Sequence, residues 1–500
     1  MSLPAFIAGA TKYGERTWVL KSVSENEYID NIPIDDLGDD YSTRGNEYVN
    51  VLVRAHKRLR DFAICLAEKL LLEALPYDSF LNDIETETKW DVVDVDMGLM
   101  YDLLYTKATK IYRKGGFIVR FISFGSTMIV LVGLIIQTAQ LNFRKEDDKI
   151  DIAITWVLIA GALVLEVYAA IVIFSSHWMM LWLIKQGRQE WVIKLSDRFP
   201  CLFKKKKNWS NTMGQFDLLD YWLKQREREI HSTSRNRSIR LVLWRTIRSV
   251  IGRKYEKKWN RSLHGTQVSV RSSVYKAILN LCKTESRYST CFFYRYGHDE
   301  LKQQVDDELR RVGSILGDDE HESNILGTRG QKVIMYMHLA TKICYHFETQ
   351  EEDDDDGPDS SLWKEDREVS KALSDYMMYL SIMQPSMLPE SGLSVDGKRF
   401  IDQKERIGVT QEVGEACRHL LAEEGEEWAE IVGILNGIDD KGRRWEVVKL
   451  QWWMILRSAF NNGFVLRDAH LQQLTHGGEF LTFLWMLYTP PNLEFLSRSV

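Results

Sequence analysis

The stretch FISFGSTMIVLVGLIIQT, Phe121–Thr138, carries no charged residue, and none follows it until Arg144. At about 1.5 Å per helical residue, it crosses most of a hydrocarbon core about 30 Å thick. Core helices of soluble proteins rarely run so far without charge. We therefore expect a transmembrane helix, and a buried helical hairpin inside a large soluble protein is the alternative left open.

A second apolar stretch follows directly. Ile152–Ile184 is interrupted only by Glu166 and His177. It exceeds the roughly 20 residues that a span needs, so we expect its end to leave the bilayer, with Trp178 and Trp182 at headgroup level. The fold class expected is mostly α: a two-span transmembrane helical hairpin with helical cytosolic domains on both sides.

Charge around the two stretches predicts their orientation. The short connection Arg144–Asp151, RKEDDKID, has few basic residues, whereas both outer flanks have many. They are Lys107, Lys110, Arg113, Lys114 and Arg120 on one side, and Lys185, Arg188, Lys194 and Lys204 to Lys207 on the other. Cytosolic flanks are enriched in Lys and Arg. We expect an integral protein of the plasma membrane or endomembranes, mostly cytosolic, with no glycan at Asn208, Asn236 or Asn260.

Composition fits this picture. The 500 residues include 65 basic and 71 acidic ones, and the net charge of −6 is too even a balance to indicate nucleic-acid binding by the chain as a whole. Nine prolines are too few for a many-stranded β-protein and favour long helices. The six cysteines form no CxxC pair, which favours isolated reduced thiols over a disulfide framework or a zinc site.

Six segments are expected along the chain. They are 1–26, a remnant of an upstream span with a juxtamembrane segment; 27–116, a cytosolic helical region; 117–184, the hairpin; 185–347, a basic cytosolic helical region; 348–361, the acidic linker ETQEEDDDDGPDSS; and 362–500, a C-terminal helical module. Apolar spacing and breakers predict helices over 47–75, 91–108, 210–223, 272–282, 299–316, 331–347, 373–383, 410–422, 426–436, 444–461 and 478–487.

Two kinds of candidate site emerge. Glu166 lies near the middle of the second stretch, where an ionised carboxylate is costly, so it is either a proton or cation relay, a helix contact, or a protonated or snorkelling carboxyl. Basic clusters after the hairpin are candidates for anionic lipid or an acidic partner. Their members are Lys204, Lys205, Lys206, Lys207, Arg245, Arg248, Arg253 and Lys254. No RNA-binding signature accompanies them, so a nucleic-acid partner is not expected.

Other motifs carry no chemistry. GLSVDGKR, Gly392–Arg399, lacks the hydroxyl of a phosphate-binding loop, and Glu352–Gly357 lacks the bidentate Glu of a calcium loop. His338, Cys344 and His346 are spread around their helix, which favours packing over metal ligation. The C-terminal aromatics are expected in the core: Trp445, Trp452, Trp453, Phe480, Phe483 and Trp485. We expect no catalytic residue, metal or cofactor, and no enzyme.

Six strings resemble one family, in the expected order. They are KYGERTWVL at 12–20, MYDLLYTKA at 100–108, NWSNTMGQFDLL at 208–219, MHLATKIC at 337–344, SDYMMYLSIMQPSMLP at 374–389 and HLQQLTHGGEFLTFLWML at 470–487. They resemble the plant membrane proteins with "domain of unknown function 4220", which usually end in "domain of unknown function 594". The resemblance implies a plant integral membrane protein that is shortened at its N-terminus, and it supplies no enzymatic activity.

These observations lead to two functional hypotheses. The first is a membrane-anchored interaction or scaffold protein, whose partners are the lipid bilayer, proteins that bind the cytosolic helical domains, and anionic lipids. The second is a component of a transporter or channel that uses Glu166 within the membrane.

Overall fold

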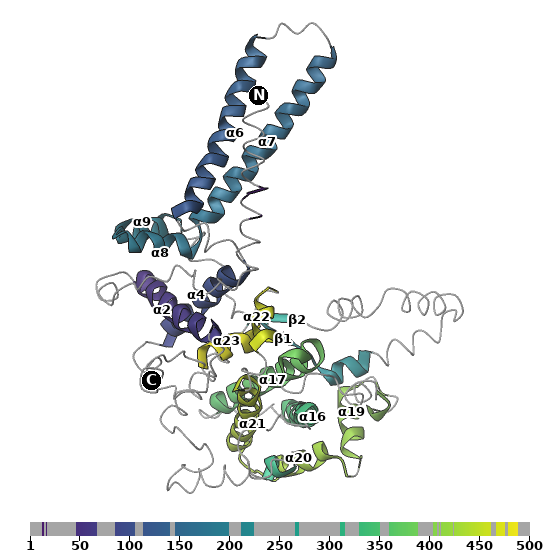
Figure 1. The fold of residues 1–500 in the computed structure, drawn as a ribbon. Coiled ribbons are helices and arrows are strands. Elements are labelled where there is room, and N and C mark those ends of the chain that lie inside the picture. The colour runs from purple at the N-terminus through teal and green to yellow at the C-terminus, as the bar shows by residue number, and fades with distance from the viewer. Residues whose placement is uncertain are drawn as a thin grey trace. The chain divides into compact units, whose positions relative to one another are not determined.

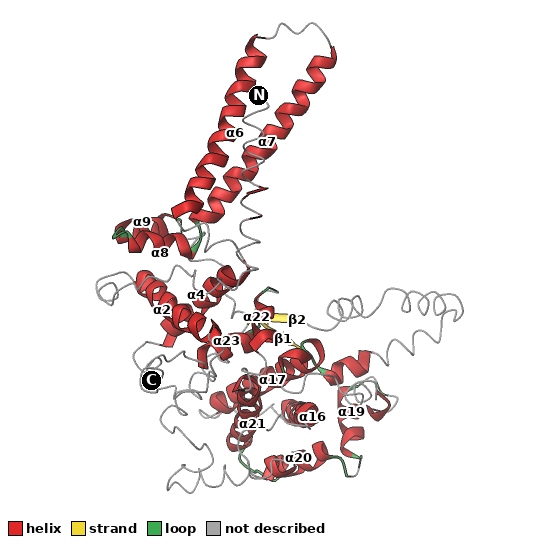
Figure 2. Cartoon of the chain, in the orientation of Figure 1, coloured by secondary structure: helices red, strands yellow, loops and turns green. Residues whose placement is uncertain are grey.

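A computed structural model describes residues 13, 14, 17, 47–67, 86–105, 114–140, 146–199, 212–224, 266–269, 311–315, 330–350, 360–388, 404–407, 410, 412–423, 425–461, 467–475 and 479–488. Helices make up 89% of them (Figure 2), which confirms the mostly α prediction. Contacts divide the chain into two units. The helices between residues 47 and 198 belong to the N-terminal unit, and the elements from residue 212 onward belong to the C-terminal unit.

Two helices pack against each other in the N-terminal unit. α2 (Glu47–Ala67) and α4 (Thr86–Tyr105) pack together through buried aliphatic residues, among them Leu52 and Met97. Arg58 Nε lies 3.2 Å from Asp96 Oδ2 in the same interface, and both side chains are buried. The two helices confirm the expected segments 47–75 and 91–108, although residues 68–75 and 106–108 lie outside the described ranges.

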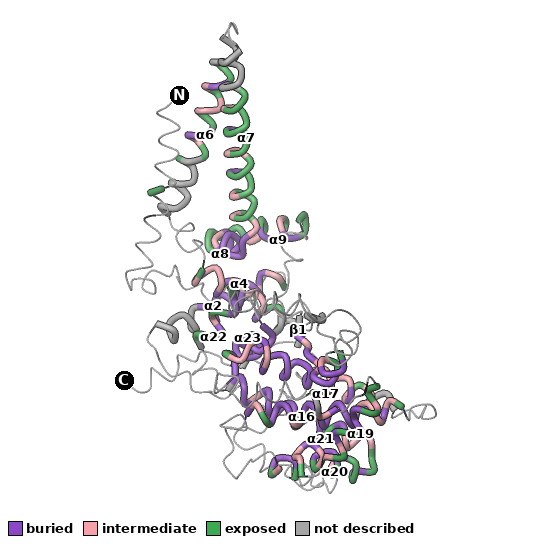
Figure 3. Tube along the Cα trace, turned by 90° about the vertical axis from the view of Figure 1, so that its right-hand side faces the viewer, coloured by how far each residue is buried: buried purple, intermediate pink, exposed green. Residues whose placement is uncertain are grey.

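The longest helices of this unit form a hairpin. α6 (Lys114–Gln140) and α7 (Glu146–Phe174) run side by side (Figure 1). Among the described residues, one segment, Ala153–Phe174, is long and apolar enough to cross a membrane, and only 11% of its apolar window is buried. The apolar segment on α6, Phe124–Ile136, is shorter. Figure 3 shows α7 exposed along most of its length.

The second apolar stretch is not one continuous helix. It breaks at Ser175–Ser176, where the Ser176 hydroxyl accepts a hydrogen bond of 3.3 Å from Trp178 N and so caps α8 (His177–Lys185). Trp178 is only 4% exposed and meets His56 edge-on, with ring centroids 6.3 Å apart. The Trp178 side chain therefore packs against α2, and its place at headgroup level remains a prediction.

α9 (Gln189–Arg198) completes the N-terminal unit. It follows Gly187, whose φ of 72° lies in the left-handed region that glycine adopts without strain. α8 packs against α2 and α4, and α9 packs against α8 and α2. Its buried residues are Val192 and Ser196.

The C-terminal unit is built around three long helices. α17 (Ser360–Met383) packs against both α16 (Gly330–Gln350) and α21 (Lys441–Asn461). Shorter elements surround them: a helical turn at 311–315, η4 (Pro385–Met387), η5 (Lys404–Ile407), α19 (Val413–Leu421), α20 (Glu427–Asn436), α22 (Arg467–Leu474) and α23 (Phe480–Tyr488). α22 was not predicted.

Aromatic side chains fill the core of this unit. All six residues predicted there, Trp445, Trp452, Trp453, Phe480, Phe483 and Trp485, are at most 2% exposed. Tyr376 joins them and meets Phe480 edge-on at 5.8 Å. The predicted packing role of these aromatics is therefore confirmed.

One predicted helix is wrong over half its length. Within 210–223, residues Thr212–Gln215 form β1, which pairs antiparallel with β2 (Thr266–Ser269), and the helix begins only at Leu218. Pairing with the distant strand β2 has overridden the helical preference expected of the local sequence. Phe216 N also donates to Asp375 O of α17 at 3.0 Å. Gly214 lies so close to α17 that a Cβ there would overlap the ring of Tyr379.

The acidic segment between α16 and α17 is shorter than its predicted bounds. α16 continues to Gln350 and α17 begins at Ser360, so both ends of 348–361 are helical. Residues 351–359 lie outside the described ranges. The six-segment division of the chain remains a prediction, as do the helices at 272–282 and over most of 299–316.

Candidate functional site

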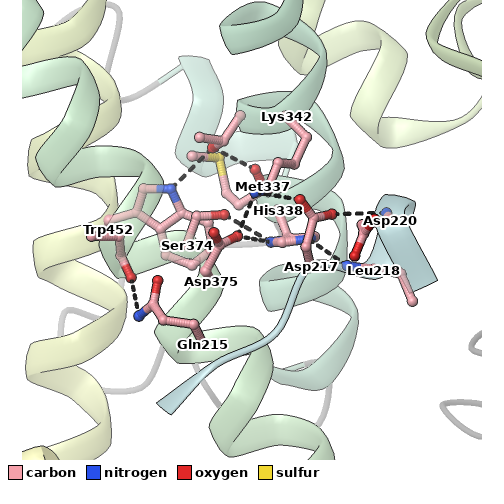
Figure 4. A network of polar contacts seen from close by, with 12 residues as sticks. Gln215, Asp217, Leu218, Asp220, Met337, His338, Lys342, Ser374, Asp375 and Trp452 are labelled. Carbon is pink, nitrogen blue, oxygen red and sulfur yellow. Dashed lines mark hydrogen bonds and ion pairs between the residues drawn. The ribbon is translucent and has the colours of Figure 1, made fainter. Parts of the chain in front are cut away.

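A cluster of mostly buried polar side chains lies where α16, α17 and the residues after β1 meet (Figure 4). His338, Thr341 and Lys342 share one face of α16, because residues three and four apart stack along a helix. Ser374 and Asp375 come from α17, and Asp217 and Leu218 follow β1. We refer to Asp217, His338, Lys342, Ser374 and Asp375 as the clasp.

Lys342 is the centre of the clasp. Its Nζ lies 2.7 Å from Asp217 Oδ2 and 2.6 Å from Asp375 Oδ1. The Lys342 and Asp375 side chains are 6% and 10% exposed, whereas Asp217 is 33% exposed and forms the accessible edge. One cation therefore sits between two carboxylates with little water around it.

The three charges shift one another's pKa values. Burial opposes the charged form of Lys342, but the two carboxylates outweigh it and raise the pKa of the ammonium. Burial also opposes the charged form of Asp217, yet Lys342 lowers its pKa to about 2. Asp375 is the carboxyl whose charged form is least favoured, because burial and the charge of Asp217 raise its pKa to about 6 despite Lys342.

His338 uses both ring nitrogens within the clasp. Leu218 N–H donates to Nε2 at 3.2 Å, so a neutral ring carries its proton on Nδ1, which donates to Ser374 Oγ at 2.8 Å. Burial and the neighbouring Lys342 lower the pKa of His338 to about 3. The imidazole is therefore neutral at physiological pH.

A second set of contacts supports the clasp. Thr341 Oγ1 donates to Met337 O at 2.7 Å and accepts a hydrogen bond of 3.0 Å from Trp452 Nε1 of α21. Gln215 Nε2 donates to Ala372 O of α17 at 3.2 Å. The end of β1 is thus tied to α17, and α16 is tied to α21.

The geometry of the clasp favours a structural role over a catalytic one. The Lys342 ammonium is held protonated, which makes it a poor nucleophile. His338 offers no free lone pair, since Nε2 accepts from the backbone and Nδ1 carries the proton. The ion pairs of the clasp therefore hold the segment after β1 against α16 and α17.

Glu166, the membrane candidate, lies on a shielded side of α7. It is 6% exposed, whereas its neighbours Leu165 and Val167 are 65% and 52% exposed. On α6, Ser126 and Thr127 are also buried. The carboxyl therefore lies on the side of α7 that the chain covers, away from the exposed apolar surface.

The remaining predicted residues lie outside the described ranges. They are Lys204, Lys205, Lys206, Lys207, Arg245, Arg248, Arg253 and Lys254. Among the residues that are described, no group of three or more His, Cys, Asp or Glu side chains is arranged to hold a metal ion.

Sequence reasoning did not identify the clasp, although a signal was present. Its residues fall in three of the six family-like strings: Asp217 in NWSNTMGQFDLL, His338 and Lys342 in MHLATKIC, and Ser374 and Asp375 in SDYMMYLSIMQPSMLP. Polar residues in separate strings of this kind are candidates for one shared site. His338 was assigned to packing, and its complete burial fits that interpretation.

Comparison with known proteins identifies two domains. The family model described as domain of unknown function (DUF4220) matches residues 1–221, from the start of the chain to just beyond β1. The family model described as protein of unknown function, DUF594, matches residues 438–490, which include α21, α22 and α23. Neither the curated proteins nor the solved structures contain a significant match. The chain therefore carries a DUF4220 domain at its N-terminal end and a DUF594 domain toward its C-terminal end.

Proposed function

We propose that the α6–α7 hairpin crosses a lipid bilayer twice and that the helical units outside it form an interaction scaffold in the cytosol. The observation that carries this proposal is the apolar surface that α7 leaves uncovered. Its most exposed side chains, Val157, Leu158, Val164, Leu165 and Tyr168, are between 65% and 72% exposed. At about 100° per residue they fall within an arc of about 120° on one side of the helix, opposite the buried Ile159 and Glu166.

A surface of this kind is costly in water. Monomeric soluble proteins rarely expose contiguous apolar patches larger than a few hundred Å². The 22 residues Ala153–Phe174 extend about 33 Å as a helix, close to the hydrocarbon thickness of about 30 Å. Length and exposure together favour lipid as the covering medium.

α6 supports a second crossing. Its described apolar side chains include Ile129, Val132 and Ile136, which are more than half exposed. Two crossings return the chain to the side on which it started. The basic residues of both outer flanks favour the cytosol as that side.

The scaffold role is supported by how the C-terminal unit uses its polar groups. The clasp joins a chain segment to α16 and α17, and Lys449 of α21 pairs with Asp366 of α17 at 2.6 Å. These charges stabilise the packing of helices, which leaves the outer surface of the unit to contact partners. On this basis we propose a binding role and no enzymatic activity.

Density-gradient flotation of cell membranes tests the anchoring. We expect the wild-type chain to float with lipid after alkaline extraction. Each Arg at the centre of a span costs about 2.5–3.5 kcal/mol, so Val164→Arg with Leu165→Arg should shift the chain to the soluble fraction. Val413→Arg is the matched control, because Val413 is an exposed valine on α19. Wild-type protein that fails to float would refute the anchoring.

A transport function is the second candidate, because Glu166 is a shielded carboxyl within the otherwise uncharged segment Ala153–Phe174 of α7. Glu166→Gln keeps the shape of the side chain and removes its charge. A scaffold variant should keep its membrane location and bound proteins. A carrier that titrates this carboxyl should lose the pH dependence of its flux, measured in proteoliposomes.

A further inference from the structure

α9 presents a mixed aromatic and basic face. Trp191 is 58% exposed, and Phe199, directly after the helix, is 45% exposed. Arg188, Lys194 and Arg198 are exposed beside them. We refer to these five residues as the α9 face.

The helical period gathers most of these side chains. Trp191, Lys194 and Arg198 follow at intervals of three and four residues and so share one side of the helix. Val192 and Ser196 are buried on the other side. The α9 face is therefore the outward side of a helix that is already anchored by its inner side.

The position of α9 in its unit brings this face close to the end of the apolar segment. The apolar segment of α7 ends at Phe174, and the chain then turns at Ser175–Ser176 into α8. α8 and α9 lie across the end of the hairpin at which α7 finishes (Figure 1). If α7 crosses a bilayer, α9 lies at the level of the lipid headgroups rather than far from the membrane.

The chemistry of the face fits an anionic lipid surface. Tryptophan is enriched at membrane–water interfaces, where its ring is partly buried and its N–H stays hydrated. Basic side chains near an anionic leaflet each gain affinity from its negative potential. Lys194 Nζ lies 3.9 Å from Glu190 Oε2, but both side chains are at least 74% exposed, so this pair competes weakly with lipid.

We propose that the α9 face binds the anionic phospholipid headgroups of the leaflet at which α7 ends. The proposal rests on the membrane anchoring proposed above and adds a lipid class and a binding surface. It predicts that anionic lipid orders α9 without altering the hairpin.

Hydrogen–deuterium exchange of the full chain in lipid nanodiscs tests this. One set of discs holds phosphatidylcholine alone, and the other adds phosphatidylserine. We expect exchange over residues 189–198 to slow by about tenfold or more in the anionic discs, since three basic residues contribute. Exchange over 153–174 should be slow in both, and exchange over α20 should be the same in both.

Substitution assigns the effect to the face. Arg188→Gln, Lys194→Gln and Arg198→Gln together should abolish the lipid-dependent protection of α9. The control combines Lys224→Gln, Lys332→Gln and Arg418→Gln, three exposed basic residues of the C-terminal unit, and should retain it.

The possible failures are distinguishable. Equal exchange of α9 in both discs, with α7 protected, would overturn the lipid-binding proposal alone. Fast exchange of α7 in both discs would overturn the anchoring as well. Protection of α9 by added poly-glutamate but not by phosphatidylserine would assign the face to an acidic protein and overturn the lipid assignment.

Discussion

Replacing Lys342 with methionine tests the clasp most directly. Methionine has a similar length but no charge, so the substitution leaves Asp217 and Asp375 facing each other without a cation. Removing one partner of a buried ion pair typically costs about 3–5 kcal/mol. Asp217 is a third exposed and regains some hydration, so we expect a loss of about 3 kcal/mol.

The loss should be visible as a lower midpoint of thermal unfolding. For a unit of this size, 1 kcal/mol shifts the midpoint by about 2–4 °C, which gives a decrease of about 6–12 °C. Intrinsic tryptophan fluorescence of the full chain in detergent micelles reports on the right region. Trp222, Trp428, Trp452 and Trp485 are all buried within the C-terminal unit.

The pH dependence provides a second, independent test. The folded pKa of Asp375, about 6, lies above its usual value, and loss of Lys342 raises it further. A carboxyl of this kind takes up a proton on folding, so its destabilising effect is relieved as the pH falls through the folded pKa. The deficit of the variant should therefore shrink between pH 8 and pH 6. In the wild type Asp217, with a folded pKa of about 2, stays ionised throughout, whereas in the variant it loses the cation that lowers its pKa, so any proton that it takes up shrinks the deficit in the same direction.

Lys449→Met is the matched control. Lys449 Nζ lies 2.6 Å from a single carboxylate, that of Asp366, and the two side chains are 16% and 26% exposed. We expect a cost of about 1 kcal/mol, with no trend over the same pH range. Equal losses for the two lysine variants, or a deficit of Lys342→Met that grows on acidification, would refute the reasoning.

Three further substitutions test the packing of the C-terminal unit, each followed by urea unfolding. Arg444→Met should cost about 3 kcal/mol because it leaves the buried Glu348 carboxylate without its cation, and adding Glu348→Met should restore much of the loss. Gly214→Ala should cost about 1–3 kcal/mol through overlap with the Tyr379 ring, and Tyr379→Leu should reduce that cost. Trp428→Phe should cost about 1 kcal/mol, since its Nε1 donates to the α19 backbone at 3.1 Å; an unchanged midpoint would contradict this contact.

Most helices could be predicted because their determinants are local. α16, α20 and α21 begin and end within three residues of the ranges expected from apolar spacing. Buried aromatics on α21 and α23 mark the core for the same reason. A repeating apolar face can be recognised from the sequence of one helix alone, without knowing which element it packs against.

The features that the sequence did not reveal depend on distant partners. β1 is four residues long and is defined by its pairing with β2. Leu218 and His338 meet although they are 120 residues apart. The break after α7 lies inside an apolar run, where the only local signal is the Ser176 cap. Neither composition nor periodicity encodes which distant polar groups will meet.

β1 and the clasp limit which segments of the chain can be exchanged between related proteins. The DUF4220 match ends at residue 221, yet its last ten residues are folded into the same core as α21 of the DUF594 match. Trp452 donates a hydrogen bond to Thr341, and Lys449 pairs with Asp366. Both partner residues lie upstream of residue 438. A hybrid that grafts residues 438–490 from a relative would therefore keep these contacts only where the graft carries matching residues at positions 449 and 452. The two domains of unknown function should be transplanted together with the chain that joins them.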